Sequence, residues 1–138
     1  MAKNHLTMRV PAEVLEGIER EARRLGRPMT SLAADLLGEA LVMRTYPGIG
    51  YREGAAGRRA ALIGHRIDVH QVVAHVQQGK ADLDEAAAHF GVSRGLIRSA
   101  MEFYADHRAE VDEWARRQAE FSAEAERRWR AGQASATA

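Results

Sequence analysis

The stretch from His5 to Val10 alternates polar and apolar residues and ends at Pro11, where an amphipathic helix is expected to begin. Because successive side chains of a strand point to opposite faces, this alternation predicts a short strand with one apolar and one polar face. The apolar side chains are Leu6, Met8 and Val10, and the polar ones are His5, Thr7 and Arg9. A strand without a neighbour leaves its backbone groups unpaired, so we expect it to pair with the same strand of a second copy.

Two amphipathic helices are expected after this strand. The first has Pro11 at its first helical position, acidic residues near its start, and Gly26 as its stop. The second begins between Pro28 and Ser31 and ends before Tyr46. The residues at core-facing spacing are Val14, Leu15, Ile18, Ala22 and Leu25 in the first helix, and Leu32, Leu36, Leu37, Ala40 and Leu41 in the second. A strand and two helices in roughly 40 residues bury too little apolar surface alone, which favours an intertwined dimer.

On this strand and these two helices, residues 4 to 44 resemble a ribbon-helix-helix DNA-binding domain of the Arc, MetJ and CopG class. The resemblance implies a homodimer whose paired strands lie in the major groove of a double-stranded DNA operator. It implies base contacts by His5, Thr7 and Arg9, and a phosphate bound by backbone amides at Met29, Thr30 and Ser31. Arg9 is the best candidate, because a guanidinium can contact guanine O6 and N7 together. The alternative is an ordinary edge strand with solvated polar residues.

The overall composition is that of a globular protein with room for two small domains, at 138 residues and 46% hydrophobic content. The formal net charge is only +1, so DNA binding must depend on local basic patches. Arg20, Arg23, Arg24 and Arg27 form either such a patch or a solvated helix face paired with Glu19 and Glu21. The absence of cysteine excludes disulfides. No apolar run is long enough for a signal peptide or a membrane span, so we expect a cytoplasmic protein.

A second unit is expected from Tyr46-Pro47, where proline and several glycines break the helical periodicity. Residues 49–53 and 58–63 predict a β-hairpin around Gly54-Ala55-Ala56-Gly57. Three helices should follow it. Asp68 and Gln71 are the expected start signals of a helix from Val69 to Gln78, which Gly79 closes. Asp82 and Glu85 are those of a helix from Leu83 to Phe90. Ser93 is expected to cap the third helix.

The last two of these helices have the spacing of a helix-turn-helix. The small side chain of Ala87 allows close helix packing, Gly91 makes the turn, and the apolar pair Leu96-Ile97 follows. If this motif reads DNA, Arg94 and Arg98 lie one turn apart and face the groove. The alternative is that the motif only packs the helices together.

Residues 46 to 112 also resemble a bacterial family known as domain of unknown function 433. The residues that carry the resemblance are Gly57-Arg58-Arg59, the run Leu62-Ile63-Gly64-His65-Arg66-Ile67, Gly79, Tyr104, His107 and Glu110. His65 stands where threonine is usual in the family. Members resemble antitoxins that pair with toxins of PIN-like ribonuclease fold. The resemblance therefore implies a toxin protein as a partner.

The last segment predicts a long helix, because no helix breaker occurs between Val111 and Gly132. One stripe of this helix carries Val111, Trp114, Gln118, Phe121, Ala125 and Trp129. Aromatic residues on an otherwise charged helix are typical interface anchors, although the helix could instead fold back on its own domain. The acidic metal-binding pocket of a PIN-like toxin suits the cations of this segment, which are Arg116, Arg117, Arg127, Arg128 and Arg130. Residues 133–138 are expected to be a disordered tail.

Six histidines raise the question of metal binding or catalysis. His70 and His75 are five positions apart and fall on different faces of their helix. His107 and Glu110 lie one turn apart, where a hydrogen bond between them is the simpler expectation. No nucleophile with a nearby base and no phosphate-binding glycine loop can be placed. We therefore expect no enzymatic activity, no metal and no cofactor.

These patterns predict a mainly α protein. Residues 1–45 form the ribbon-helix-helix domain, residues 46–112 form the antitoxin-like domain with a hairpin and a helix-turn-helix, and residues 113–138 form the partner-binding helix and tail. The expected function is that of a DNA-binding antitoxin and transcriptional autorepressor that neutralises a PIN-like ribonuclease toxin. The alternative is a stand-alone dimeric ribbon-helix-helix regulator without a toxin.

Overall fold

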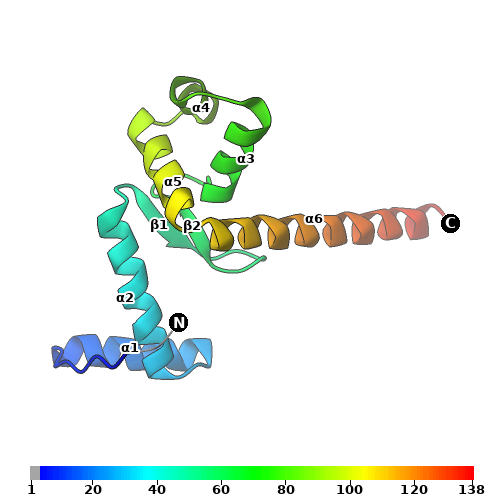
Figure 1. Cartoon of the computed structure of the whole chain (residues 1–138). Coiled ribbons are helices and arrows are strands. Elements are labelled where there is room, and N and C mark those ends of the chain that lie inside the picture. The colour runs from blue at the N-terminus through cyan, green and yellow to red at the C-terminus, as the bar shows by residue number, and fades with distance from the viewer. Residues whose placement is uncertain (1–3) are drawn as a thin grey trace. The chain divides into compact units, whose positions relative to one another are not determined.

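The computed structural model describes residues 4–138, and in this range the chain is mainly helical with one small antiparallel sheet (Figure 1). The elements are α1 (Ala12–Leu25), α2 (Met29–Thr45), β1 (Ile49–Arg52), β2 (Arg59–Leu62), α3 (Val69–Gly79), α4 (Leu83–Phe90), α5 (Arg94–Asp106) and α6 (Arg108–Thr137). They divide into a first unit that ends at Leu41 and a second unit from Val42 to Ala138. Among the described residues, no helix combines the length and the apolar character that crossing a membrane requires.

The first unit consists of α1 and most of α2, and both predicted helices are confirmed. Pro11 is the residue before α1 rather than its first helical residue, and its carbonyl accepts from the backbone N–H groups of Val14 and Leu15 at 3.0 and 3.2 Å. Gly26 ends α1 in the left-handed conformation with φ 64°, which a glycine adopts without steric cost. The boundary signals at both ends are therefore local, which explains why the sequence predicts them.

The first unit buries very few of its side chains. Of its described residues, only Ala22 and Leu32 are buried. Residues 4–10 contain no strand, and Leu6 and Met8 are 71% and 57% exposed, so the expectation that they enter a core is not met within one chain. The physical reason is that the single chain offers residues 4–10 no strand with which to pair.

The apolar side chains of this unit instead line an open groove of about 450 Å³. Its lining comes from Met8, Val10, Val14, Leu15, Ile18, Met29, Thr30, Ala33, Leu36 and Leu37. Ile18 and Ala33 are half-buried, whereas Val14, Leu15, Leu36 and Leu37 remain exposed. One copy of this unit thus presents an apolar face that it does not cover.

The second unit has a hydrophobic core, to which its small sheet contributes. β1 and β2 pair antiparallel, with Ile49 opposite Leu62 and Arg52 opposite Arg59, as the predicted hairpin requires. Gly54 in the connecting loop lies against the guanidinium of Arg59, so a side chain there would require Arg59 to shift. The largest fully buried side chains are Phe103, Ile49, Leu62, Ile97, Val69, Val72 and Val111.

The helices of the second unit begin where the sequence predicts. Gln71 Oε1 accepts from the backbone N–H of Asp68 at 2.7 Å, and Asp82 Oδ1 accepts from that of Glu85 at 2.8 Å. One predicted stop is wrong by a residue: Gly79 is the last residue of α3, and Lys80 adopts the left-handed conformation with φ 47°. The chain turns at Lys80 because Ala81 N–H donates back to Val76 O at 3.2 Å.

The C-terminal helix is longer than predicted at both ends. α6 runs from Arg108 to Thr137, so Gly132 does not break it and the expected disordered tail at residues 133–138 is helical up to Thr137. A single glycine costs a helix only about 1 kcal/mol, and neighbouring alanines offset this cost. The expected boundary between residues 112 and 113 lies inside α6, which is continuous there.

Candidate nucleic-acid and protein interfaces

The three candidate base-reading residues lie on the segment before α1. His5, Thr7 and Arg9 are all exposed, and none of them forms a hydrogen bond or ion pair with residues 4–138. Met8 and Val10, which alternate with them, line the apolar groove. The alternation therefore persists for Met8 and Val10, which lie at the groove, but not for Leu6, which is exposed and does not line it.

The candidate phosphate site is the start of α2. Met29, Thr30 and Ser31 are its first three residues, and all of them are exposed. The first N–H groups of a helix lack intrahelical acceptors and carry the positive end of the helix dipole, which suits an anion. Thr30 also lines the apolar groove, so this helix start adjoins the uncovered face.

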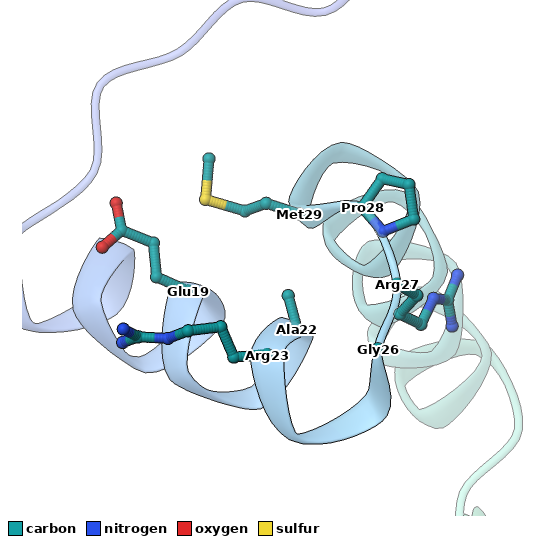
Figure 2. A pocket seen from close by; sticks show the side chains of 7 residues that line it. All are labelled: Glu19, Ala22, Arg23, Gly26, Arg27, Pro28 and Met29. Carbon is teal, nitrogen blue, oxygen red and sulfur yellow. The ribbon is translucent and has the colours of Figure 1, made fainter.

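Arg27 stands beside this helix start but is already paired. Its Nη2 donates to Ser31 Oγ at 2.5 Å and lies 2.6 Å from Asp35 Oδ2. Figure 2 shows the neighbouring hollow, where Arg23 and Glu19 extend from α1 while Arg27 points away on the other side of the turn. A phosphate at Ser31 must compete with this ion pair for the guanidinium.

Within the described chain, two of the four arginines of the candidate basic patch pair with acidic residues, and the other two do not. Arg24 donates through Nε to Glu21 Oε2 at 2.9 Å, and Arg27 is held by Asp35. Arg20 and Arg23 are exposed on α1. Acid pairing in this unit thus involves Glu21 and Asp35, and a DNA-binding role for the four arginines stays a prediction.

In the second unit, α4 and α5 form around a turn at Gly91, which has φ 67°. Ser93 Oγ accepts from the backbone N–H of Leu96 at 3.2 Å and so caps α5. Arg94 is ion-paired with Asp84 at 2.7 Å, and both side chains are mostly exposed. Arg98 is exposed at the rim of a groove of about 330 Å³ whose apolar lining includes Leu83 and Met101. Of the two predicted DNA-contacting arginines, Arg94 forms an ion pair within the described chain, whereas Arg98 forms none and shares the groove lining with Glu102.

A buried charge cluster that the sequence does not reveal connects the hairpin to α3. Asp68 is 3% exposed and accepts from Arg52 Nε and from Arg59 Nε, each at 2.6 Å. Its Oδ2 also lies 3.2 Å from Nε2 of the buried His70, without hydrogen-bond geometry. Burial alone would raise the pKa of Asp68, but interactions with His70, Arg52 and Arg59 outweigh it and hold the pKa well below its usual value. Arg59, part of the antitoxin-like resemblance, is thus a structural residue here.

The aromatic stripe of α6 splits into two parts. Val111 is buried, and Trp114 is half-buried with its ring parallel to that of Phe103 at 6.2 Å between centroids. Phe121 and Trp129 are 45% and 67% exposed. The alternative of a fold-back therefore applies to the first turns of α6, whereas Phe121 and Trp129 are the exposed aromatic residues of the stripe.

All five candidate partner-binding arginines are exposed and paired with glutamates of the same helix. The pairs are Arg116 and Arg117 with Glu113, Arg116 with Glu120, Arg127 and Arg128 with Glu124, and Arg130 with Glu126. Hydrogen bonds from Arg116 and Arg117 lower the pKa of Glu113 to about 2. Such exposed pairs are weak, so an acidic partner can replace the glutamates.

The histidines form no ligand set. Among residues 4–138, no group of three His, Asp or Glu side chains has metal-binding geometry. His75 stacks on His89 with ring centroids 3.8 Å apart, and its Nε2 lies 3.0 Å from Glu85. The expected hydrogen bond between His107 and Glu110 is wrong, because His107 Nδ1 lies 3.2 Å from the carbonyl oxygen of Phe103 instead.

Comparisons with family models, with curated proteins and with solved structures find no match to this chain. The resemblances to the ribbon-helix-helix class and to domain of unknown function 433 therefore depend on the residues named above. Function has to be inferred from the surfaces just described, namely the uncovered groove, the polar segment before α1 and the exposed part of α6.

Proposed function

We propose that this chain is a dimeric DNA-binding antitoxin and autorepressor that acts in the cytoplasm and neutralises a ribonuclease toxin of PIN-like fold. The observation that carries the proposal is the uncovered apolar face of the first unit. That face borders both candidate DNA-contacting elements, the segment from His5 to Arg9 and the start of α2. Dimerisation and DNA binding are therefore proposed to depend on the same surface.

Burial energetics support a dimer of the first unit. Two buried side chains cannot offset the conformational entropy of a unit of this size. Covering an exposed Leu or Met is worth about 1.5 to 3 kcal/mol each, so a second copy placed on the groove supplies the missing core. Pairing of the two segments around Met8 would then satisfy their backbone groups as a two-stranded ribbon.

The polar face of that ribbon suits the major groove of DNA. His5, Thr7 and Arg9 recur at every second position, so in a strand they share one face, and all three are exposed. Arg9 supplies a bidentate donor for guanine, and Thr7 supplies a hydroxyl and a methyl group. The start of α2 would hold a backbone phosphate and so fix the register of the ribbon on the duplex.

The antitoxin part of the proposal rests on the resemblance to domain of unknown function 433 and on α6. Its exposed arginines lie along a helix whose outer turns touch nothing in the described chain. An acidic nuclease pocket would attract them. The second candidate function, a stand-alone regulator, is favoured by one observation: all five arginines already have glutamate partners.

The dimer is tested by Met8→Asp with Thr7→Asp as its matched control. Both variants place a carboxylate in the same segment, but only Met8 lines the groove. We expect Met8→Asp to unfold the first unit and abolish operator binding, whereas Thr7→Asp should weaken operator binding and leave the first unit folded. Circular dichroism and DNA titration at fixed salt measure the two properties. A Met8→Asp protein whose first unit remains folded and bound to the operator would exclude the ribbon.

Co-expression with the neighbouring gene separates the two candidate functions. Co-purification of a small nuclease whose activity falls on binding supports the antitoxin function. A protein that is stable alone, dimeric and bound to promoter DNA, with no effect on the neighbouring gene product, supports the stand-alone regulator. The thermal midpoint of the first unit should rise with protein concentration in either case, because folding is coupled to dimerisation.

A further inference from the structure

The outer part of α6 carries a stripe of two aromatic residues, two small residues and one glutamine whose spacing is symmetric. Its members are Gln118, Phe121, Ala125, Trp129 and Gly132, separated by three, four, four and three positions. At about 100° per residue, all five lie within about 40° of Ala125 around the helix axis. The pattern reads the same from either end, with Ala125 at its centre.

This stripe continues the face by which α6 already packs in its own unit. Val111 is buried and Trp114 packs on the core, and both lie on the same side of the helix as Ala125. Beyond Gln118 the core ends while the stripe goes on, which leaves Phe121 and Trp129 exposed. Two uncovered aromatic rings on a packing face indicate an interface.

We propose that this stripe pairs antiparallel with the same stripe of a second copy, with the two-fold axis at Ala125. A two-fold interface requires a self-complementary surface, in which residue i meets residue j and j meets i. Phe121 then meets Trp129 of the partner subunit, and the reciprocal contact repeats it. Gln118 likewise faces Gly132 of the partner subunit. Small side chains at Ala125 and Gly132 let the two helix axes approach to about 8 to 10 Å.

The charges beside the stripe agree with this pairing. Glu124 and Arg128 lie on the same flank, and Arg128 Nε is 3.3 Å from Glu124 Oε1 within one helix. An antiparallel pair brings this flank against its own copy, with Glu124 offset by about 3 Å along the axis both from Arg128 and from Glu124 of the partner subunit, so its intrahelical pair with Arg128 neutralises it there. On the other flank Glu126 is neutralised by Arg130 at 2.5 Å. No unpaired like charges therefore meet across the axis.

The pairing leaves other α6 cations available. Arg116, Arg127 and Arg130 lie more than about 130° from Ala125 around the helix, on the side away from the stripe. The inference is thus independent of the proposed toxin, which can approach the arginine side. Because the ribbon already joins two copies through the first unit, a second self-pairing surface gives the chain a route to assemblies larger than a dimer.

Disulfide trapping in the full chain tests the pairing, since the sequence contains no cysteine. Ala125→Cys puts the two thiols at the two-fold axis, within reach of a disulfide. Ala123→Cys is the matched control, because it changes an equally small and exposed residue on the opposite side of the helix. Under mild oxidation at micromolar protein, we expect Ala125→Cys to cross-link at least about tenfold faster than Ala123→Cys, because pairing raises the effective thiol concentration.

The orientation is tested by mixing Gln118→Cys chains with Gly132→Cys chains, with helicity checked by circular dichroism. The mixture should cross-link, whereas each variant alone should not. Adding Phe121→Ala and Trp129→Ala to Ala125→Cys should bring its rate down to that of the control. Equal rates for Ala125→Cys and Ala123→Cys would overturn the pairing. Cross-linking of Gln118→Cys alone would overturn the antiparallel orientation. If Ala125→Cys is protected from oxidation only in the presence of a co-expressed protein, the stripe binds that protein instead of a second copy.

Discussion

The indole ring of Trp114 lies parallel to the phenyl ring of Phe103, with an interplanar angle of 9° and ring centroids 6.2 Å apart. Phe103 is fully buried in α5, so this contact attaches the first turns of α6 to the core of the second unit. Trp129, four turns further along the same helix, has no such cover. The two tryptophans of the chain therefore have different roles, one in stability and one at a surface.

Replacing each tryptophan separately should reveal this difference. Trp114→Ala removes packing on Phe103 and should lower the free energy of unfolding of the second unit by about 2 to 4 kcal/mol. Trp129→Ala should change it by less than about 0.5 kcal/mol in dilute protein, because an exposed side chain loses little on truncation. Urea unfolding followed by circular dichroism measures both values. Equal small losses would mean that α6 is not attached through Trp114.

Operator recognition should depend on Arg9 in a sequence-specific way. Arg9→Ala should weaken binding to the operator by about 1 to 3 kcal/mol and binding to random DNA only slightly, because a base contact carries the discrimination. Arg23→Ala is the control: this exposed cation of α1 has no base-reading position, so it should affect both DNAs alike. Titrations of both variants with the operator and with random DNA, at one fixed salt concentration, measure these losses in affinity. Parallel losses for Arg9→Ala on the two DNAs would exclude base reading by this residue.

The Asp68 cluster predicts a dependence of stability on acid pH. The folded-state pKa of Asp68 lies below its ordinary value of 3.8, so the stabilising contribution of its charge is complete above that pH and disappears as pH falls toward the folded-state pKa. Asp68→Asn leaves the buried Arg59 without its charged partner and should cost about 3 to 5 kcal/mol at pH 7. The cost should shrink below pH 3.8.

A matched control for this substitution is Asp84→Asn. Asp84 also pairs with an arginine, Arg94, but both side chains are mostly exposed. Its replacement should change the free energy of unfolding by less than about 1 kcal/mol at any pH. Urea unfolding at several pH values compares the two variants. An Asp68→Asn protein as stable as Asp84→Asn at pH 7 would show that the cluster does not support the hairpin.

Tyr46 predicts a complementary effect at alkaline pH. Its hydroxyl donates to Asp106 Oδ2 at 2.5 Å, and this hydrogen bond, together with burial, raises the pKa of Tyr46 to about 12. Because the folded-state pKa exceeds the ordinary tyrosine value of 10.0, the stabilising contribution of this hydrogen bond is complete below pH 10 and is lost as pH rises toward 12. Unfolding free energies of the wild-type chain should fall over this range. Tyr46→Phe should be less stable at pH 8 and show a flatter alkaline decline.

Local signals in the sequence predict much of the fold. Gly26, Asp82 and Ser93 each act on backbone groups within a few residues, so the helix ends they mark are recognisable without knowledge of the rest of the chain. The hairpin is predicted for the same reason. By contrast, Gly132 is a stop signal that its neighbours override, because propensity is only a weak bias within a long helix.

Contacts between distant residues explain what the sequence does not reveal. Arg52 and Asp68 meet across 16 positions, and no spacing rule connects them. The period of α6 places Trp114 and Trp129 on one stripe, but only the core of the second unit determines which of them is covered. Residues 4–10 are a different case, because they form no strand in the single chain and the second chain expected to pair with them stays a prediction.

Truncation of α6 should separate DNA binding from partner binding. A chain ending at Ala119 keeps the buried Val111 and the packed Trp114 but lacks the last three candidate cations, Arg127, Arg128 and Arg130. Because the first unit and the core are intact, operator binding should be unchanged. Binding of a co-expressed toxin should be strongly weakened, since arginine anchors typically carry about 2 kcal/mol or more each. A pull-down and a DNA titration of the same protein measure both. If the truncated chain retains the toxin fully, the partner surface lies on the hairpin side, where Arg58 and Arg66 are exposed.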